Sequence, residues 1–154
     1  MTEGKCSMTV SGDYYLIDQQ PFSFIPYHVV TNEEDFRVDG QTNYWITSDW
    51  KTGDEASLYM TFQCPVIVRG FLMKNTHNAG YQDRGTQNFT ISIPDSLTGA
   101  WTDILTSSLP DARNVSPVPV NTYQLDTLVE TSLVRFQVNT FYGRGGGLQF
   151  FSTF

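Results

Sequence analysis

Apolar and polar residues alternate in short runs along this chain, which is the pattern of half-buried β-strands. The cleanest alternation starts at Leu133 or Val134 and continues to Thr140. Helical signals are weak, and the best candidate is one capped turn at Asn32–Arg37. The predicted strands are Ser7–Val10, Tyr14–Ile17, Trp45–Thr47, Leu58–Phe62, Val66–Met73, Phe89–Ile93, Trp101–Thr106, Asn121–Leu125, Leu133–Thr140 and Leu148–Phe154. About eight to ten short strands joined by turns predict an all-β fold, an antiparallel β-sandwich of the jelly-roll type.

Composition supports one β-rich domain over residues 1–154. Aromatic residues make up 14% of the chain and charged residues only 16%. Bulky rings pack well on a pleated sheet surface, so this composition suits strands. Leu109–Pro119 contains three prolines and is predicted to be a long loop.

The net charge of −7 argues against two classes of partner. The nine basic residues do not cluster, whereas nucleic-acid binding requires a basic stripe that neutralises phosphates. Electrostatic attraction to an anionic membrane is disfavoured for the same reason. No apolar run is long enough to span a bilayer, and the first residues do not resemble a signal peptide. The sequence therefore predicts either a cytoplasmic protein or an extracellular domain without its leader.

Catalytic motifs are absent from the sequence. His28 and His77 are its two histidines, and neither belongs to a zinc-binding pattern. There is no nucleophile elbow or phosphate-binding loop, so we expect a non-catalytic protein. The carboxylates of Glu33–Asp35 and of Asp54 and Glu55 are expected in solvated loops. Cys6 and Cys64 are expected to be reduced thiols, with a disulfide as the alternative in an oxidising compartment.

Several segments in the right order resemble discoidin-like domains, also called coagulation factor V/VIII type C domains, of the galactose-binding-like superfamily. The segments are Asp39-Gly-Gln-Thr42 before Trp45, Gln63-Cys-Pro-Val-Ile-Val-Arg-Gly-Phe71, Arg84-Gly-Thr-Gln-Asn-Phe89 before Trp101, Leu133-Val-Arg-Phe-Gln-Val138, and Tyr142-Gly-Arg-Gly-Gly-Gly-Leu-Gln-Phe-Phe151. They cover residues 36–154, and residues 1–35 would supply N-terminal strands and a first loop. The resemblance implies a jelly roll that binds its ligand through loops at one end.

The chain departs from this family in two places. It has no cysteine after Cys64 to form the terminal disulfide of many members. Gln149 stands where many carbohydrate-binding relatives have a glutamate that completes a structural calcium site. The calcium site that the resemblance implies would use Asp39, Thr42 and Gln149. No other cofactor is expected.

Two loops combine aromatic rings with polar side chains, as sugar recognition requires. They are Ser48–Lys51 and Asn75–Tyr81, and the resemblance places both at the ligand-binding end. Trp50 lies beside charged residues, so its ring is either exposed or caps the core. For Arg84 we favour a structural pairing with Asp83 or another carboxylate. Trp45 and Trp101 are expected in the core. The predicted ligand-binding residues are Asp49, Trp50, His77, Asn78, Tyr81, Arg84 and Arg144.

Three functions remain open from the sequence. The first is a lectin-like module for galactose-type glycans, which would bind weakly and act through several copies or as a homo-oligomer. The second is a protein-interaction or scaffolding module, which the absent leader favours. The third is a membrane-binding module that inserts Phe22, Phe24 and Ile25. The acidic balance counts against the third.

Overall fold

The computed structural model describes residues 6–16, 23–38 and 41–154 of the chain. Its elements are β1 (Met8–Gly12), η1 (Pro26–Val30), β2 (Arg37–Val38), β3 (Gln41–Thr42), β4 (Trp45–Ile46), η2 (Gly53–Glu55), β5 (Ser57–Lys74), η3 (Ala79–Tyr81), β6 (Asn88–Pro94), β7 (Trp101–Ser108), β8 (Asn121–Val138), β9 (Gly147–Leu148) and β10 (Phe150–Thr153). Within the described residues, the helical elements are short 3-10 turns, and none is a helix that could cross a bilayer.

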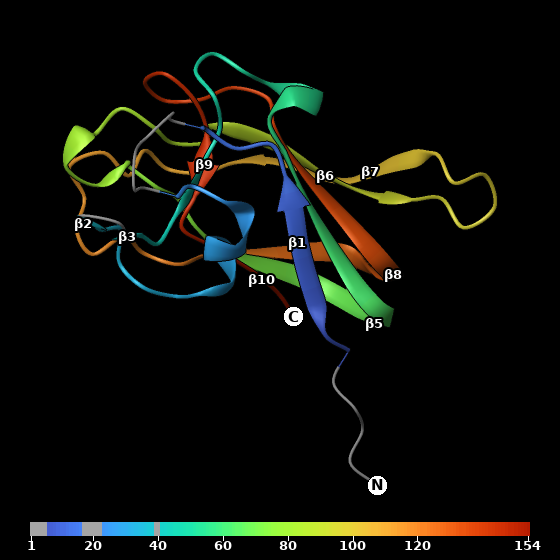
Figure 1. Ribbon diagram of the computed structural model, residues 1–154. Helices are drawn as coiled ribbons and strands as arrows, with labels where there is room; N and C mark the ends of the chain where they lie inside the picture. The colour runs from blue at the N-terminus through green and yellow to red at the C-terminus, as the bar shows by residue number, and fades with distance from the viewer. Residues whose placement is uncertain (1–5, 17–22, 39–40) are drawn as a thin grey trace, which may run out of the picture.

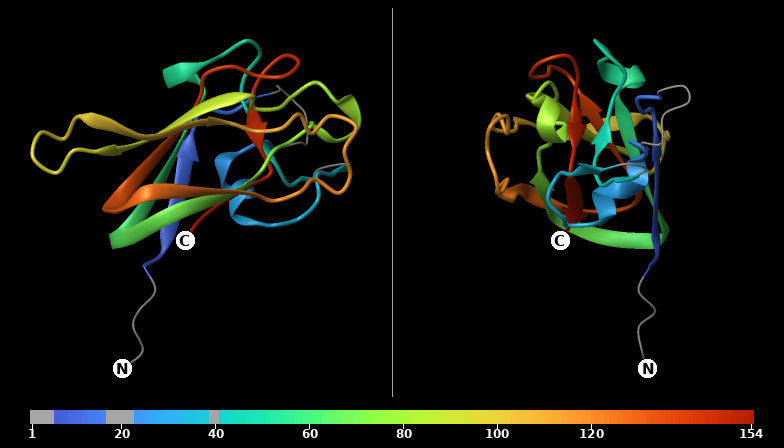
Figure 2. Two further views of the ribbon diagram at one scale, coloured as in Figure 1. Left: turned by 180° about the vertical axis from the view of Figure 1, so that it is seen from behind. Right: turned by 60° about the vertical axis from the view of Figure 1, so that its left-hand side comes forward.

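Two long antiparallel strands, β5 and β8, organise the main sheet. The strand order is β1-β5-β8-β6-β7, and β10 also pairs with β5. The β5–β8 register shifts between Thr61 and Val66, and there both strands fold back at one corner (Figure 1). The first half of β5 pairs with β1, and the second half pairs with β10. The β5–β8 ribbon therefore belongs to two layers, a larger one with β1, β6 and β7 and a smaller one with β10 (Figure 2).

Aromatic side chains fill the space between the two layers. Phe136 on β8 and Phe151 on β10 lie 6.1 Å apart between ring centroids, and Phe151 also packs on Phe71 of β5 at 5.5 Å. Phe89 on β6 stacks on Phe136 at 5.2 Å. Trp45, as expected, is fully buried against Phe136. These contacts confirm the antiparallel β-sandwich predicted from the alternating pattern.

A smaller apolar cluster supports the loops at the end away from the corner. Phe24, Tyr44 and Ile46 are buried there, and Phe24 packs on the rings of Tyr15 and Tyr44. The burial of Phe24 contradicts the expectation that it inserts into a membrane; Ile25 is partly exposed, and Phe22 lies outside the described residues. We call this end, formed by residues 47–52, 75–87, 109–120 and 139–146, the loop end.

Four further expectations, which concern one strand, one turn, Trp101 and the cysteines, are wrong. Tyr14–Leu16 is irregular rather than strand, with Ile17 outside the described residues. Residues 32–36 form no helical turn, because the turn lies earlier, at η1, where Pro26 begins it. Trp101 is exposed on the outer face of the larger layer, beside Tyr59 and under the guanidinium of Arg135 at 4.2 Å.

The fourth correction concerns the cysteines. Cys6 and Cys64 form a disulfide, with their Cα atoms 5.6 Å apart, a separation typical of such bonds. It joins the segment before β1 to the corner of β5, where Gln63 also donates its N–H to the carbonyl of Ser7. The two thiols meet because β1 and β5 are antiparallel neighbours, a pairing that a single sequence does not reveal.

Candidate functional site

Four charged side chains form an alternating network at the loop end. Arg84 and Arg144 both contact the carboxylate of Asp49. The same two guanidinium groups lie 3.3 Å and 3.8 Å from the carboxylate of Asp83. Arg84 is only 2% exposed, so its charge requires these partners. The two positive and two negative charges cancel, and the network presents both donors and acceptors to solvent.

Backbone contacts hold the three loops of this network together. The N–H of Trp50 donates to the carbonyl of Arg144 at 2.7 Å, and the N–H of Arg144 donates to the carbonyl of Asp83 at 2.8 Å. Gly143 has φ +74°, and a Cβ atom there would lie 2.4 Å from the Asp83 carbonyl oxygen. Only glycine allows the backbone of residue 143 to lie so close to the Asp83 carbonyl group, which explains one glycine of the glycine-rich Gly143–Gly147 segment.

A pocket of about 160 Å³ opens beside the network, and we call it the arginine pocket. Asn78 is fixed within it: its Oδ1 accepts from the hydroxyl of Tyr44 at 2.7 Å, and its Nδ2 donates to Asp83 at 2.7 Å. Burial raises the pKa of Tyr44, so this hydroxyl remains a donor. The pocket is lined by Tyr15, Arg37, Asn78, Tyr81, Asp83, Arg84 and Arg144.

Tyr15 and Tyr81 line the arginine pocket, whereas Trp50 is outside its lining and packs on Phe141 at 5.9 Å. Tyr81 is exposed, and the guanidinium of Arg37 lies 4.4 Å from its centroid and 4.9 Å from that of Phe24. Trp50 is 66% exposed, which confirms the first of its two predicted placements. Its φ of +64° is rare for a bulky residue, and such backbone strain is concentrated at functional sites. The site thus combines flat apolar surfaces with fixed polar groups.

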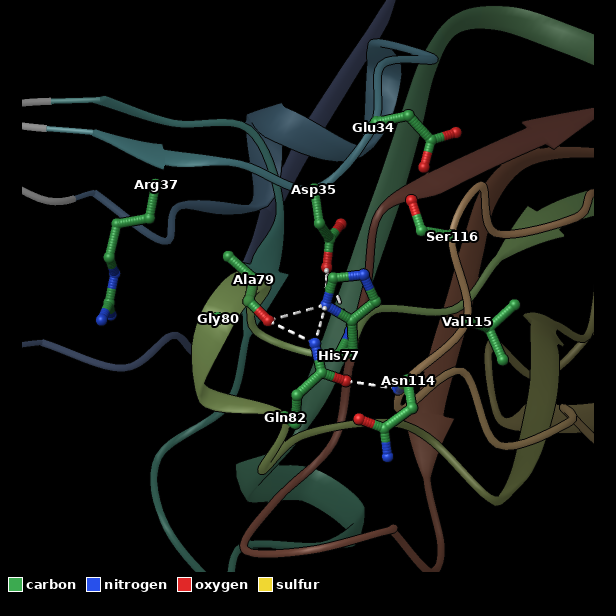
Figure 3. A pocket seen from close by; sticks show the side chains of 10 residues that line it. All are labelled: Glu34, Asp35, Arg37, His77, Ala79, Gly80, Gln82, Asn114, Val115 and Ser116. Atoms are coloured by element: carbon green, nitrogen blue, oxygen red, sulfur yellow. Dashed lines mark hydrogen bonds and ion pairs between the residues drawn. The ribbon is translucent and has the colours of Figure 1, made fainter.

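His77 belongs to a different pocket, of about 580 Å³, which we call the histidine pocket (Figure 3). Its Nδ1 lies 3.0 Å from the carbonyl of Ala79 and 3.6 Å from the carboxylate of Asp35. Asn78 adopts the left-handed conformation, with φ 63°, so the two neighbouring side chains diverge. His77 and Asn78 thus line different pockets, and their role in ligand binding stays a prediction. The histidine pocket is lined by Glu34, Asp35, Arg37, His77, Ala79, Gly80, Gln82, Asn114, Val115 and Ser116.

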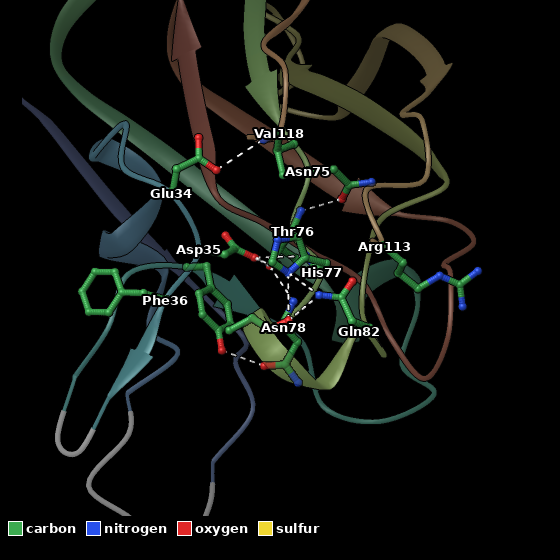
Figure 4. Close-up of polar contacts among 12 residues, drawn as sticks. Glu34, Asp35, Phe36, Asn75, Thr76, His77, Asn78, Gln82, Arg113 and Val118 are labelled. Carbon is green, nitrogen blue, oxygen red and sulfur yellow. Dashed lines mark hydrogen bonds and ion pairs between the residues drawn. The ribbon is translucent and has the colours of Figure 1, made fainter. Parts of the chain in front are cut away.

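Asp35 is buried beneath this second pocket, contrary to its expected place in a solvated loop. Its Oδ2 accepts from the Thr76 hydroxyl at 2.5 Å and from the His77 N–H at 3.0 Å (Figure 4). Its Oδ1 is buried without a hydrogen-bond partner in the structure. Burial raises the pKa of Asp35, and the hydrogen bonds from Thr76 and His77 oppose that rise.

Four of the residues that line the arginine pocket were predicted from the sequence, and three were not. Asn78, Tyr81, Arg84 and Arg144 come together as predicted, with Asp49 bridging the arginines. The structural pairing favoured for Arg84 is confirmed, since it contacts Asp83 and Asp49. The missed lining residues are Tyr15, Arg37 and Asp83. For Asp83 a signal existed, because it precedes Arg84 in the chain; Tyr15 and Arg37 come from segments without a motif.

The described residues alone make a poor calcium site. Thr42 donates its hydroxyl hydrogen to the carbonyl of Ser23, and Gln149 offers a neutral amide, buried with both polar atoms unpaired. Calcium takes six to eight oxygens and prefers carboxylates. Among the described residues there is no group of three or more acidic, histidine or cysteine side chains that could hold a metal. Asp39 lies outside them, so calcium binding remains a prediction that depends on this residue.

Comparison with solved structures identifies the fold, whereas comparison of the sequence finds no match. No protein-family model matches the sequence, and no curated protein matches it either. Solved structures do match the fold. A Clostridium perfringens CBM32 module, in complex with GalNAc-β-1,3-galactose, superposes with a TM-score of 0.70 at 9% identity, over 96% of this chain and 94% of that chain.

Two further family 32 carbohydrate-binding modules are similar. The one from Streptococcus pneumoniae EndoD has a TM-score of 0.57 at 16% identity, over 80% of this chain and 88% of its own. The one from C. perfringens NanJ, in complex with galactose, has a TM-score of 0.62 at 13% identity, over 95% of this chain and 92% of its own. The chain therefore has the discoidin-like β-sandwich fold of these modules, as the resemblance of residues 36–154 implied.

Proposed function

We propose that this protein is a non-catalytic module that binds a neutral, galactose-type carbohydrate in the arginine pocket. The observation that carries the proposal is the network of Asp49, Asp83, Arg84 and Arg144 beside exposed rings. Carbohydrate-bound modules of the same fold support it, since two of those compared hold galactose or a galactose-containing disaccharide.

The network suits sugar hydroxyl groups chemically. Each hydroxyl can donate to a carboxylate and accept from a guanidinium or amide, and bonds to charged groups are the stronger ones. Because Arg84 and Asn78 are already held by protein contacts, binding orders few side chains. Exposed Tyr81, which lines the pocket, offers a flat surface for the less polar face of a sugar ring. Exposed Trp50 is joined to the pocket through its backbone bond to Arg144.

The four-residue network carries no net charge of its own, and Arg37 adds a third guanidinium group to the pocket. Asp49 and Asp83 lie within contact distance of both arginines, so an anion that approached the guanidinium groups would also meet two carboxylates. Repulsion between like charges at such distances opposes binding. A neutral hexose or N-acetylhexosamine makes both kinds of hydrogen bond without that cost.

The geometry of His77 and Asp35, a carboxylate–histidine pair at a pocket, also fits a binding role rather than a catalytic one. Nδ1 of His77 is closer to the carbonyl of Ala79, at 3.0 Å, than to Asp35, at 3.6 Å. A catalytic triad needs the carboxylate to orient the imidazole and a nucleophile bonded to its other nitrogen. Neither arrangement is found in the described part of the chain, which supports a module without an active site.

Calorimetric titration with galactose and N-acetylgalactosamine, and with glucose and mannose for comparison, tests the proposal. Arg144→Ala should weaken galactose binding about tenfold, since it removes a charged donor from the pocket. Arg113→Ala is the matched control, because Arg113 also pairs with an aspartate, Asp111, but does not line the pocket. If none of these sugars binds the wild-type protein at millimolar concentration, the proposal is wrong.

A further inference from the structure

We propose that the histidine pocket is a second carbohydrate subsite, so that the protein selects a disaccharide or longer glycan over a single sugar. This inference rests on the proposed function of the arginine pocket. It assigns to His77, Asn114 and Ser116 the recognition of the sugar next to the one held by Arg84 and Arg144, with buried Asp35 holding His77 in place.

The two pockets are neighbours across a narrow ridge. Arg37 lines both of them. The turn η3 separates them: Asn78 and Tyr81 line the arginine pocket, while Ala79 and Gly80 line the histidine pocket. The ridge consists of this turn and the Arg37–Tyr81 stack. A glycan that crossed it would place adjacent sugar residues in the two pockets.

Pocket size also favours more than one sugar. Small-molecule sites in proteins generally enclose about 300–1,000 Å³. The arginine pocket, with about 160 Å³, is below this range, whereas the histidine pocket, with about 580 Å³, is within it. A ligand confined to the arginine pocket would leave the larger, adjacent and polar pocket unused.

The base of the histidine pocket is held in place by the protein itself. Asp35 is completely inaccessible, and its Oδ2 accepts hydrogen bonds from the Thr76 hydroxyl at 2.5 Å and from the His77 N–H at 3.0 Å. These bonds fix His77 at the wall of the pocket, so binding of a ligand there would order few protein groups.

The neighbouring histidine adds an imidazole that is held at the pocket wall. Nδ1 of His77 lies 3.0 Å from the carbonyl of Ala79 and 3.3 Å from the amide nitrogen of Gln82. Imidazole nitrogens donate or accept hydrogen bonds according to the tautomer, so the ring can match either polar atom of a hydroxyl group. Opposite it lies the loop of Asn114 and Ser116, whose amide and hydroxyl can donate and accept (Figure 3).

This lining identifies the chemical class of the occupant. Charged and amide side chains, among them Glu34, Arg37 and Asn114, are mixed there with apolar groups such as Ala79 and Val115. A lipid tail would match only the apolar part of this lining. A neutral polyhydroxyl group satisfies acceptors and donors together, and this is the chemistry of a second sugar residue.

Two glycine variants separate the subsites. Asn78 and Asn114 both have φ 63°, so glycine fits either backbone without strain while removing one amide from one pocket. The probes are galactose and a panel of galactose-containing disaccharides: lactose, N-acetyllactosamine and GalNAc-β-1,3-galactose. We expect the wild type to bind at least one disaccharide about tenfold more tightly than galactose. Asn114→Gly should lose most of that gain with unchanged galactose affinity, and Asn78→Gly should weaken both ligands.

A spectroscopic readout complements the titrations. The imidazole resonances of His77 should shift with the preferred disaccharide and not with galactose. The aromatic ring resonances of Tyr81 should shift with both ligands. The second subsite is refuted if galactose binds but no disaccharide binds more tightly, or if Asn114→Gly leaves the disaccharide gain intact. If neither galactose nor any disaccharide binds the wild type, the proposed function itself fails, and the subsite fails with it.

Discussion

Replacing Arg84 with alanine should destabilise the protein far more than replacing Arg144, although both guanidinium groups contact the carboxylate of Asp49. The difference arises from burial. Arg84 is 2% exposed and Arg144 is 52% exposed. Arg84 also lies over the ring of Tyr15, with its guanidinium carbon 5.3 Å from the centroid. The same carboxylate thus has one buried and one solvated partner, which makes the two arginines an internal comparison.

The expected losses follow from this contrast. Removing one partner of a buried ion pair costs about 3–5 kcal/mol. Asp49 and Asp83 keep about a quarter of their side-chain surface exposed and retain Arg144, so we expect about 2–4 kcal/mol for Arg84→Ala. For a chain of this length that lowers the Tm by about 5–15 °C. Arg144→Ala should cost less than about 1 kcal/mol, because exposed ion pairs contribute little.

Urea unfolding followed by tryptophan fluorescence, with scanning calorimetry alongside, measures both losses. Trp45 is fully buried, so unfolding should change its emission strongly. Arg113→Ala, in an exposed pair with Asp111, provides the control for loss of a surface arginine. Equal free energies of unfolding for the Arg84 and Arg144 variants would refute the reasoning, since they would show that burial does not govern this network.

Three further predictions concern other parts of the account. Trp50→Ala should abolish carbohydrate binding with almost unchanged Tm, because its ring is mostly in solvent; a large fall in Tm would show that it supports the core. The pKa of Asp35 is raised in the folded state, so its ionisation costs stability as pH rises from the unfolded value through the folded one. Relative to wild type, Asp35→Asn should therefore gain stability in urea titrations between pH 4 and pH 7, and a constant difference would contradict this. If Asp39, Thr42 and Gln149 hold calcium, millimolar calcium should raise the Tm and a chelator should reverse the rise; no shift would exclude the site.

Much of the fold was predictable because strand alternation is a local signal. Leu133–Thr140 shows which side chains face the core, and Val134, Phe136 and Val138 are indeed buried. Trp101 was misplaced because an aromatic residue also suits the outer face of a sheet, where it packs under Arg135. That contact joins strands β7 and β8, which are not neighbours in the main sheet, and the sequence carries no local mark of it.

The candidate site was only partly predictable for a similar reason. Asp49, Arg84 and Arg144 stood out as charged residues beside glycine or tryptophan, and the structure brings them together. Asp35 did not stand out, because its neighbours Glu33 and Glu34 make it look solvated. Its burial depends on contacts with Thr76 and His77, about forty positions later in the chain.

The central claim is that the arginine pocket binds a neutral sugar. Nuclear magnetic resonance titration with galactose tests this claim most directly. We expect saturable shifts at Asn78, Tyr81, Arg84 and Arg144, the residues that line this pocket. The corner of β5 and β8, near Pro65 and Thr131, should not respond. Absence of shifts at millimolar galactose, or shifts confined to that corner, would contradict the account.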